Sequence, residues 1–335
     1  MARAEACENL LDEAPVPLPP TRATHSSPLA RCPPRLHRPA VHLALPTCAN
    51  LPTWEIDDRF LHAALTARGA TFAQPVWDDL AVDWRAFDAV LIRTTWDYQD
   101  KLPAFLQWAE RVGATTRLFN PAPVVRWNTH KGYLRELAAR GVPIAPTAWL
   151  LRGSQPDLAN LVAALRSPEG FLKPCVGATA RETLRFATDA AGLAAATAHV
   201  ARLLPYEDLM LQPFLSAVTT RGEWSAVFVA GRIAHCVRKV PVAGDYRVQD
   251  DFGAHDEPYQ PTADERAAAE HAMTAAASIL GAELLYGRTD WLWQDDGRCV
   301  LTELELVEPS LFFRHGTATA AALADALLAR IGARS

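Results

Sequence analysis

The chain has 335 residues, of which 50% are hydrophobic and 21% charged, with a formal net charge of −5. The length suggests two or three domains or one large one, and the composition is typical of a soluble enzyme with ample core. Without a Lys/Arg block, and with apolar runs well short of the roughly 20 residues of a membrane helix, it argues against nucleic acid and membrane as partners. The six cysteines show no CxxC spacing, which argues against a zinc site or disulfide framework and favours a cytoplasmic location.

The first 39 residues differ from the rest because they hold eight of the 25 prolines and little apolar periodicity. We predict a disordered Pro-rich tail for 1–39, the alternative being a gene start assigned too far upstream. From Ala40, apolar strands at 41–47, 71–75 and 87–92 alternate with helices at 55–68 and 102–112, and a further strand at 116–119. This alternation predicts a Rossmann-like parallel-sheet domain over 40–125.

Ligands of parallel sheets bind beyond the carboxyl ends of the strands. Arg93, Trp96 and Asp97 directly follow the strand at 87–92. We therefore predict that these three residues bind substrate.

Two lysines stand where phosphate could bind, in a central domain predicted over 126–208. Lys131 falls in the first turn of a helix predicted at 129–140, where the helix dipole favours a bound anion. Lys173 ends a strand at 170–174 and precedes a small-residue loop containing Gly177 and Ala178. Small residues allow backbone amides to approach phosphates. The alternatives are two surface lysines and an ordinary polar loop.

A C-terminal domain is predicted over 209–332, beginning with the strand LMLQPF at 209–214. A hairpin follows at 223–239, and a turn at Ala230-Gly231 would place Glu223 opposite Arg238. Either Arg238 holds a phosphate or carboxylate, or the two residues form an ordinary cross-strand ion pair. The polar segment at 243–255, which carries Arg247, is expected to be mobile. Thr262 and Glu265 form a capping box that opens a helix ending at Leu280, and the last helix is predicted at 318–331.

A second hairpin, from Leu284 to Phe313, carries most of the predicted metal chemistry. A turn at Asp296-Gly297 would pair Asp290 with Glu303 and Arg288 with Glu305. Because side chains alternate along a strand, these four lie on one face, and Trp291 and Trp293 on the other, core-facing side. Three carboxylates beside one Arg suit Mg²⁺, whereas the alternative is a solvated charged strand face.

Taken in order, these features resemble the ATP-grasp superfamily over residues 41–330. The resemblance implies a mixed α+β fold in which two α+β subdomains clamp ATP beside the N-terminal domain. It assigns Lys131 and Lys173 to the phosphates, with Glu223 also at the ATP site, and gives Arg238 a catalytic phosphate-binding role. It assigns the carboxylates Asp290 and Glu303 to Mg²⁺, with Glu305 where Asn is common, which is a departure that adds negative charge. The adenine-side connector is assigned to Gln212, Pro213, Phe214 and Leu215.

Within the superfamily the chain most resembles the glutathione-synthetase and D-alanine–D-alanine-ligase branch, and the cycloserine-forming cyclo-ligase group. Arg288-Thr289-Asp290 matches the ligase pattern RxD, which implies that Arg288 stabilises a tetrahedral intermediate. The implied enzyme is a carbon–nitrogen ligase that converts a carboxylate into an acyl phosphate for attack by an amine. Its partners would be small amino-acid-like substrates, held also by Ser310 and Arg247.

The same resemblance implies two Mg²⁺ ions, which Mn²⁺ could replace, and it leaves a homodimer open. Two rival functions remain at this stage. One is a kinase of the same fold that stops at phosphoryl transfer, and the other is a non-catalytic nucleotide-binding protein. Intact lysines and metal carboxylates favour an enzyme over the second rival.

Overall fold

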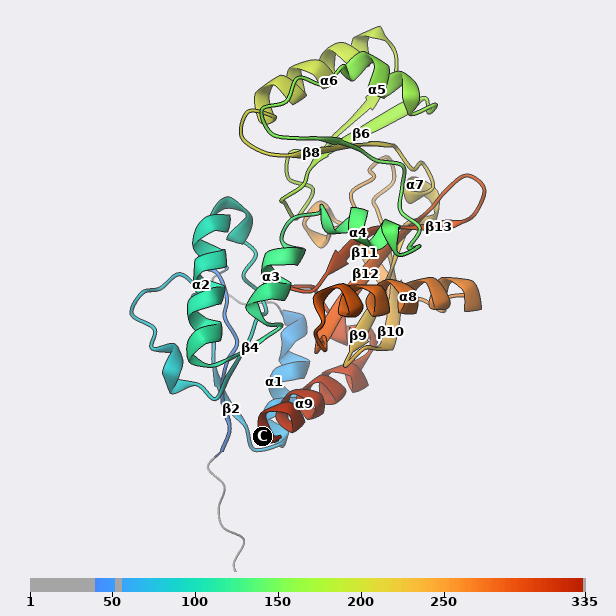
Figure 1. The fold of residues 1–335 in the computed structure, drawn as a ribbon. Coiled ribbons are helices and arrows are strands. Elements are labelled where there is room, and N and C mark those ends of the chain that lie inside the picture. The colour runs from blue at the N-terminus through green and yellow to red at the C-terminus, as the bar shows by residue number, and fades with distance from the viewer. Residues whose placement is uncertain (1–39, 52–55, 334–335) are drawn as a thin grey trace, which may run out of the picture. The chain divides into compact units, whose positions relative to one another are not determined.

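The computed structural model describes residues 40–51 and 56–333, so the disorder predicted for 1–39 lies outside the described residues and stays a prediction. Within the described ranges, three sheets follow one another along the chain (Figure 1). The first is parallel and the other two are antiparallel, as expected for the mixed α+β fold.

The N-terminal sheet has four parallel strands in the order β2-β1-β3-β4, which confirms the predicted parallel sheet. Helix α2 covers it because Phe105, Trp108 and Val112 recur at helical spacing and bury one face against the strands. The elements of this region are β1 (His42–Ala44), η1 (Ile56–Asp58), α1 (Arg59–Ala67), β2 (Thr71–Ala73), η2 (Trp84–Ala86), β3 (Ala89–Leu91), η3 (Tyr98–Asp100), α2 (Leu102–Thr115) and β4 (Arg117–Phe119).

The central sheet is antiparallel, in the order β5-β8-β6-β7, and α5 and α6 cover one face of it (Figure 1). Leu172 and Leu211 point towards these helices, so alternation turns Phe171, Lys173 and Gln212 to the other face. Since β8 pairs with β5 and β6, the sheet extends past the predicted domain boundary at residue 208. Its elements are β5 (Ala148–Leu150), α5 (Leu158–Ala164), β6 (Glu169–Pro174), β7 (Leu184–Ala187), α6 (Ala190–Leu203) and β8 (Leu209–Pro213).

The predicted helix at 129–140 is wrong in its bounds. The structure has two short helices, α3 (Ala122–Asn128) and α4 (Tyr133–Ala139), and Lys131 lies in the connection between them. The backbone N–H of Lys131 donates to the Cys175 carbonyl at 2.8 Å, a tertiary bond that replaces a helical one. Lys131 is therefore fixed by the strand-end loop of the central sheet and not by a helix N-terminus.

The C-terminal sheet has five strands in the order β11-β10-β9-β12-β13. Helix α8 packs on the face that carries Trp224 and Trp291, whose rings stack 5.6 Å apart, and Trp293 joins them in the core as predicted. The predicted capping box at the start of α8 is present. The elements are α7 (Val218–Arg221), β9 (Glu223–Val229), β10 (Arg232–Val240), η4 (Asp250–Phe252), β11 (His255–Pro258), α8 (Ala263–Leu280), β12 (Tyr286–Trp293), β13 (Cys299–Glu305), η5 (Phe313–His315) and α9 (Thr317–Gly332).

The opposite face of this sheet divides into an apolar end and a charged end. Val227 and Val229 pack with α9, which lies beside α1 (Figure 1). On the same strand, Glu223 lines a pocket and the buried Ser225 donates to the Asp290 carboxylate. Burial of large apolar side chains at about 1.5–3 kcal/mol each stabilises the sheet from both sides. The charged end is not covered by α9, and its side chains line the pocket.

The β12-β13 hairpin has the predicted pairing at the site but a different loop. Its loop has three residues, closed by a bond from Gly297 N to Gln294 O, and the strands leave it one residue out of the predicted register. An extra residue in β13, Thr302, forms a β-bulge that restores the register, so that Asp290 faces Glu303 and Arg288 faces Glu305.

In the β9-β10 hairpin the turn was right and the register wrong. Ala230 and Gly231 form the two-residue turn, with φ of +48° and +76°. A bulge between Ile233 and His235 then shifts the pairing, so Glu223 faces Lys239 and not Arg238. The predicted pair Glu223–Arg238 does not form.

Two asparagines join the N-terminal region to this sheet. Asn120 binds the Tyr286 and Leu306 carbonyls and accepts from the Leu285 amide. Asn128 donates to the Leu304 carbonyl and accepts from the Leu306 amide. These bonds satisfy buried backbone groups of β12, β13 and the residues beside them, and hold the hairpin in place.

Candidate active site

A pocket of about 340 Å³ lies where the charged end of the C-terminal sheet meets the inner face of the central sheet. Its walls come from β6 and β8 on one side and from β9, β10, β12 and β13 on the other. The loop that follows β6 and the segment that follows β13 complete it.

The two predicted phosphate lysines both line this pocket. Lys131 Nζ pairs with Glu303 at 2.8 Å and donates to the Gly177 carbonyl at 2.7 Å. Lys173 has a single long contact, 3.5 Å to the Thr302 carbonyl, and no carboxylate within ion-pair distance among the described residues. Burial lowers the pKa of Lys173, and the charge of Lys131 adds to that effect. The ammonium of Lys173 therefore has donors to spare for an anion.

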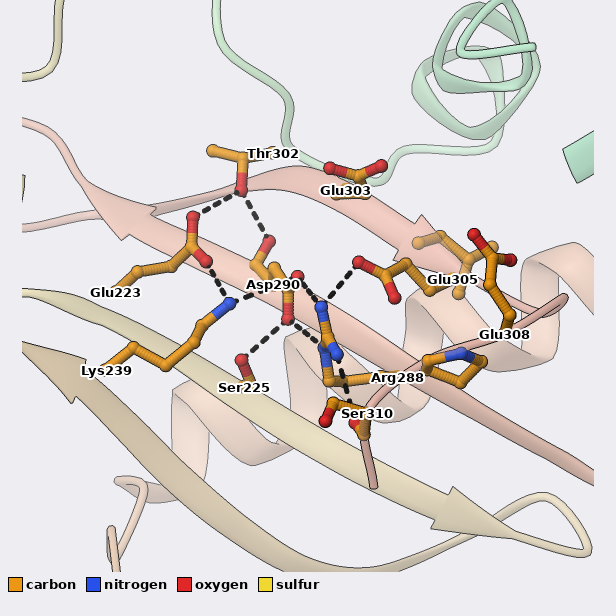
Figure 2. Close-up of polar contacts among 12 residues, drawn as sticks. Glu223, Ser225, Lys239, Arg288, Asp290, Thr302, Glu303, Glu305, Glu308 and Ser310 are labelled. Atoms are coloured by element: carbon orange, nitrogen blue, oxygen red, sulfur yellow. Dashed lines mark hydrogen bonds and ion pairs between the residues drawn. The ribbon is translucent and has the colours of Figure 1, made fainter. Parts of the chain in front are cut away.

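The face of the β12-β13 hairpin is organised by Arg288, as Figure 2 shows. Its Nε and Nη2 bind both oxygens of Asp290 at 2.8 and 2.9 Å, and Nη2 also lies 2.5 Å from Glu305. Its Nη1 donates to the Ser310 carbonyl at 3.0 Å. Burial works against ionisation of Asp290, but Arg288 and Lys239 hold its pKa well below the usual range. Burial raises the pKa of Glu305 to about 7, despite Arg288.

Lys239 occupies the place that the sequence assigned to Arg238. Its ammonium contacts Glu223 and lies 3.4 Å from Asp290. The bulge residue Thr302 turns its hydroxyl to the same spot, where it donates to the Asp290 carbonyl at 3.0 Å and lies 3.4 Å from Glu223. Arg238 points to the other side and pairs with Glu257 outside the pocket.

The charges of this cluster match. Four carboxylates, from Glu223, Asp290, Glu303 and Glu305, lie among four cationic groups. The cations are Lys131, Lys173, Lys239 and Arg288. We call these eight residues the charge-matched cluster. Three more acidic residues line the pocket outside this cluster, the exposed Asp250 and Asp251 and the buried Glu308. Burial raises the pKa of Glu308 to about 8, with Glu305 and Glu303 adding to the effect.

The segment after β13 is fixed by four side chains on four consecutive carbonyls. The Val307 carbonyl accepts from the Tyr286 hydroxyl at 2.6 Å and the Glu308 carbonyl from Trp96 Nε1 at 3.1 Å. The Pro309 carbonyl accepts from Arg93 at 3.2 Å, and the Ser310 carbonyl from Arg288. We call 307–310 the braced segment.

Of the substrate residues predicted at the end of β3, two take part in holding the braced segment and only one lines the pocket. Arg93 is 3% exposed and forms a two-pronged pair with Asp58, so it does not line the pocket. Asp97 binds Trp77 Nε1 at 2.6 Å and is likewise absent from the pocket wall. Trp96 does line the pocket. Direct substrate contact by Arg93 and Asp97 therefore has no support from the geometry, whereas Arg93 has a clear positioning contact.

An apolar slot forms the opposite end of the pocket. Phe171 and Phe214 each meet the ring of Tyr246 edge-on, at 5.6 and 5.7 Å, with Leu292 beside them. Apolar walls with a few polar groups are typical of sites for flat aromatic ligands. The remaining predicted residues in the pocket wall are Gly177, Ala178, Gln212, Pro213, Leu215, Arg247 and Ser310.

Sequence reasoning missed Lys239, Thr302, Tyr246 and Glu308. Lys239 is next to the predicted Arg238, and only the bulge decides which of the two faces the pocket. Tyr246 lies in the polar loop already singled out as functional. Glu308 lies two residues before the predicted Ser310, but nothing in the sequence shows that it is buried.

The acidic groups suit a hard divalent cation in kind, because Mg²⁺ takes few carboxylates and completes its shell with phosphates and water. Over 40–51 and 56–333, no three acidic, imidazole or thiol groups converge as a ready-made metal site. Asp290, Glu303 and Glu305 point instead at Arg288 and Lys131. A metal here would therefore need those cations to find other partners.

No helix in the described part of the chain is long and apolar enough to cross a membrane. Comparisons with known proteins agree with the fold. A family model described as D-cycloserine synthetase DcsG, N-terminal domain, matches residues 43–120. The cycloserine biosynthesis protein DcsG of Streptomyces lavendulae is 35% identical over 272 residues, which covers 76% of this chain and 87% of that protein.

Solved structures extend the likeness. The crystal structure of D-cycloserine synthetase DcsG has a TM-score of 0.78 at 33% identity, covering 87% of this chain and 99% of that one. D-alanine–D-alanine ligase from Bacillus anthracis has a TM-score of 0.62 at 13% identity, covering 87% and 97%. An ATP-grasp RimK domain protein from Sphaerobacter thermophilus has a TM-score of 0.60 at 19% identity, covering 86% and 100%.

Proposed function

The chain belongs to the D-cycloserine synthetase family of ATP-grasp ligases, and on that premise we propose that the pocket described above is where ATP, Mg²⁺ and substrate meet. The protein is an ATP-dependent carboxylate–amine ligase acting on small amino-acid-like substrates. The single observation that carries the site assignment is the set of buried lysines facing carboxylates on the β12-β13 hairpin.

The nucleotide would lie across the pocket from the apolar slot to the charge-matched cluster. The base would fit between Phe171, Phe214 and Tyr246, with Gln212 to Leu215 along its edge. Lys131 and Lys173 would hold phosphate oxygens, helped by backbone groups at Gly177 and Ala178. Lys239 takes the role that the sequence gave to Arg238.

Asp290, Glu303 and Glu305 would hold Mg²⁺, which screens the phosphate charge when it is bound. Two ions, and replacement of Mg²⁺ by Mn²⁺, are parts of this proposal. Ser225 donates to the Asp290 carboxylate at 2.6 Å and so orients it, whereas the Thr302 hydroxyl donates to the backbone carbonyl of Asp290.

The chemistry that such a pocket can support is a two-step ligation. The substrate carboxylate attacks the terminal phosphorus of ATP, and ADP leaves. An amine then attacks the acyl carbon, phosphate leaves with the C–O bond electrons, and the amine loses a proton. Arg288 would stabilise the oxyanion formed between these events.

We propose further that the amine and the carboxylate belong to one molecule, so that the product is a cyclised amino acid. The relative's name, D-cycloserine synthetase, supports this choice.

The test is to supply amino acids of both configurations, singly and in pairs, and to measure ADP and phosphate release with mass spectrometry of the products. We expect one amino acid alone to stimulate release and to give a product lighter by one water. A requirement for two different substrates would refute cyclisation. Release of ADP with a stable phosphorylated product would refute ligation in favour of a kinase.

A further inference from the structure

Glu308 differs from the four acidic residues of the charge-matched cluster. It is 9% exposed and lines the pocket, and its carboxylate accepts a hydrogen bond from its own backbone N–H. None of the described residues forms an ion pair with that carboxylate or donates a side-chain hydrogen bond to it. Glu223, Asp290, Glu303 and Glu305 each have a cationic partner. A buried carboxylate without a cation is costly unless something else supplies the charge.

The backbone around Glu308 is held in place by hydrogen bonds from other elements. It lies in the braced segment, where Tyr286, Trp96, Arg93 and Arg288 hold the four consecutive carbonyls from 307 to 310. These donors come from β12 and from the segment after β3, which are far apart in the sequence. So many bonds fix the backbone of Glu308 and leave its side chain directed into the pocket beside Glu305 (Figure 2).

The surroundings favour an ammonium group. Trp96 and Tyr98 line the pocket near Glu308, and aromatic rings beside a carboxylate are good partners for a small organic cation. Burial raises the pKa of Glu308 to about 8. A bound cation would favour its ionised form.

The other end of the braced segment presents a donor. Arg288, bound to the Ser310 carbonyl, makes four hydrogen bonds, and a guanidinium has five N–H groups. One N–H on Nη1 is left for a substrate oxygen. The braced segment thus joins a free donor for a carboxylate to an uncompensated acid, which matches the two ends of an amino acid.

We propose that Glu308 binds the α-ammonium group of the substrate and so selects amino acids over plain carboxylic acids. This inference rests on the proposed function, because it takes the pocket as the place where an amino-acid-like substrate is activated. It makes Glu308 a specificity-determining residue and not a metal ligand.

The test uses two probes, D-cycloserine and isoxazolidin-3-one, the same ring without the amino group. Each is titrated calorimetrically into the protein with ADP and Mg²⁺ present. We expect the wild type to prefer D-cycloserine by roughly 10–100-fold, the usual value of a hydrogen bond to a charged group. Glu308→Gln should lose that preference while binding isoxazolidin-3-one within about 3-fold of wild type, as expected for an unaltered ring contact.

The control is Glu257→Gln, which neutralises a carboxylate of the same sheet outside the pocket and should keep the preference. ADP affinity reports folding of each variant. The inference is overturned if the wild type binds both rings with equal affinity or binds neither. It is also overturned if Glu308→Gln still prefers D-cycloserine, or if its affinity for both rings falls by the same factor. A change confined to the Mg²⁺ dependence of ADP binding would also overturn it, in favour of a metal ligand. Failure of the proposed function is separate, since it would appear as absent ATP binding and absent ADP release in the wild type.

Discussion

Replacing Arg288 with Met should separate oxyanion stabilisation from structural pairing. Arg288 is 7% exposed and makes four hydrogen bonds, to Asp290, Glu305 and the Ser310 carbonyl. Removing one partner of a buried ion pair costs about 3–5 kcal/mol, and a domain has about 5–15 kcal/mol to lose. We therefore expect a variant that folds with a clearly lower melting temperature.

The catalytic magnitude follows from the single N–H that remains for substrate. Losing one donor to an oxyanion typically lowers the rate about 10²–10³-fold. Amide formation should fall by that factor, while the acyl phosphate still forms and can be trapped with hydroxylamine as a hydroxamate. The ratio of product to hydroxamate, and not total turnover, reports on Arg288.

The assay compares ATP affinity, trapped hydroxamate and ligated product in three proteins. Arg238→Met is the matched control, because Arg238 is on the same sheet, pairs with one carboxylate and lies outside the pocket. It should behave like wild type. An unchanged ratio of product to hydroxamate in Arg288→Met, together with weakened ATP–Mg²⁺ binding, would refute the oxyanion role and leave Arg288 as a structural partner.

Three further outcomes are expected. Glu303→Gln should abolish Mg²⁺-dependent turnover while circular dichroism shows an intact fold, because the carboxylate faces Lys131 and Asp290 in the pocket; a folded variant with the wild-type rate would exclude a metal role. Lys239→Met should weaken ATP binding about 10-fold or more, because a hydrogen bond from a charged group is lost. Titration calorimetry measures the affinity, and equal affinities for the variant and wild type would exclude the phosphate role of Lys239. Glu308 has its pKa raised from 4.5 to about 8, so the folded state holds a proton that the unfolded state releases, and stability must fall as pH rises from about 4.5 to 8. In Glu308→Gln, the loss of unfolding free energy over this pH range should be smaller by up to about 5 kcal/mol. The measurement is the melting temperature of both proteins against pH without ligands, and an equal pH dependence in the two would contradict the prediction.

The sequence predicted the correct cross-strand pairs on the β12-β13 face, but from a hairpin loop of the wrong length. Its alternation and Asp-Gly turn gave the right pairs, but the real loop is one residue longer and Thr302 absorbs the difference. In β9-β10 the turn was right, and an uncompensated bulge exchanged Arg238 for Lys239. A bulge depends on tertiary packing and leaves no local pattern, so register near a site is where sequence reasoning is weakest.

The N-terminal residues show a second limit. The pattern placed Arg93 at the end of β3, where ligands of parallel sheets bind, and that location is correct. What it could not show is that Asp58 and the Pro309 carbonyl already occupy the guanidinium. The parallel arrangement of the strands follows from the alternation of elements, whereas the partner of a charged side chain depends on distant segments.

The charge-matched cluster implies that nucleotide and metal bind by exchanging partners. Phosphates that bind Lys131 or Lys239 compete with Glu303, Glu223 and Asp290 for the ammonium groups, and a displaced carboxylate becomes available to a divalent ion. Under the proposed function, each ligand therefore frees the groups that the other needs, so ATP should raise the affinity for Mg²⁺ by the same factor by which Mg²⁺ raises the affinity for ATP. Neither should bind well alone, because it would leave one half of the exchanged pairs buried and uncompensated.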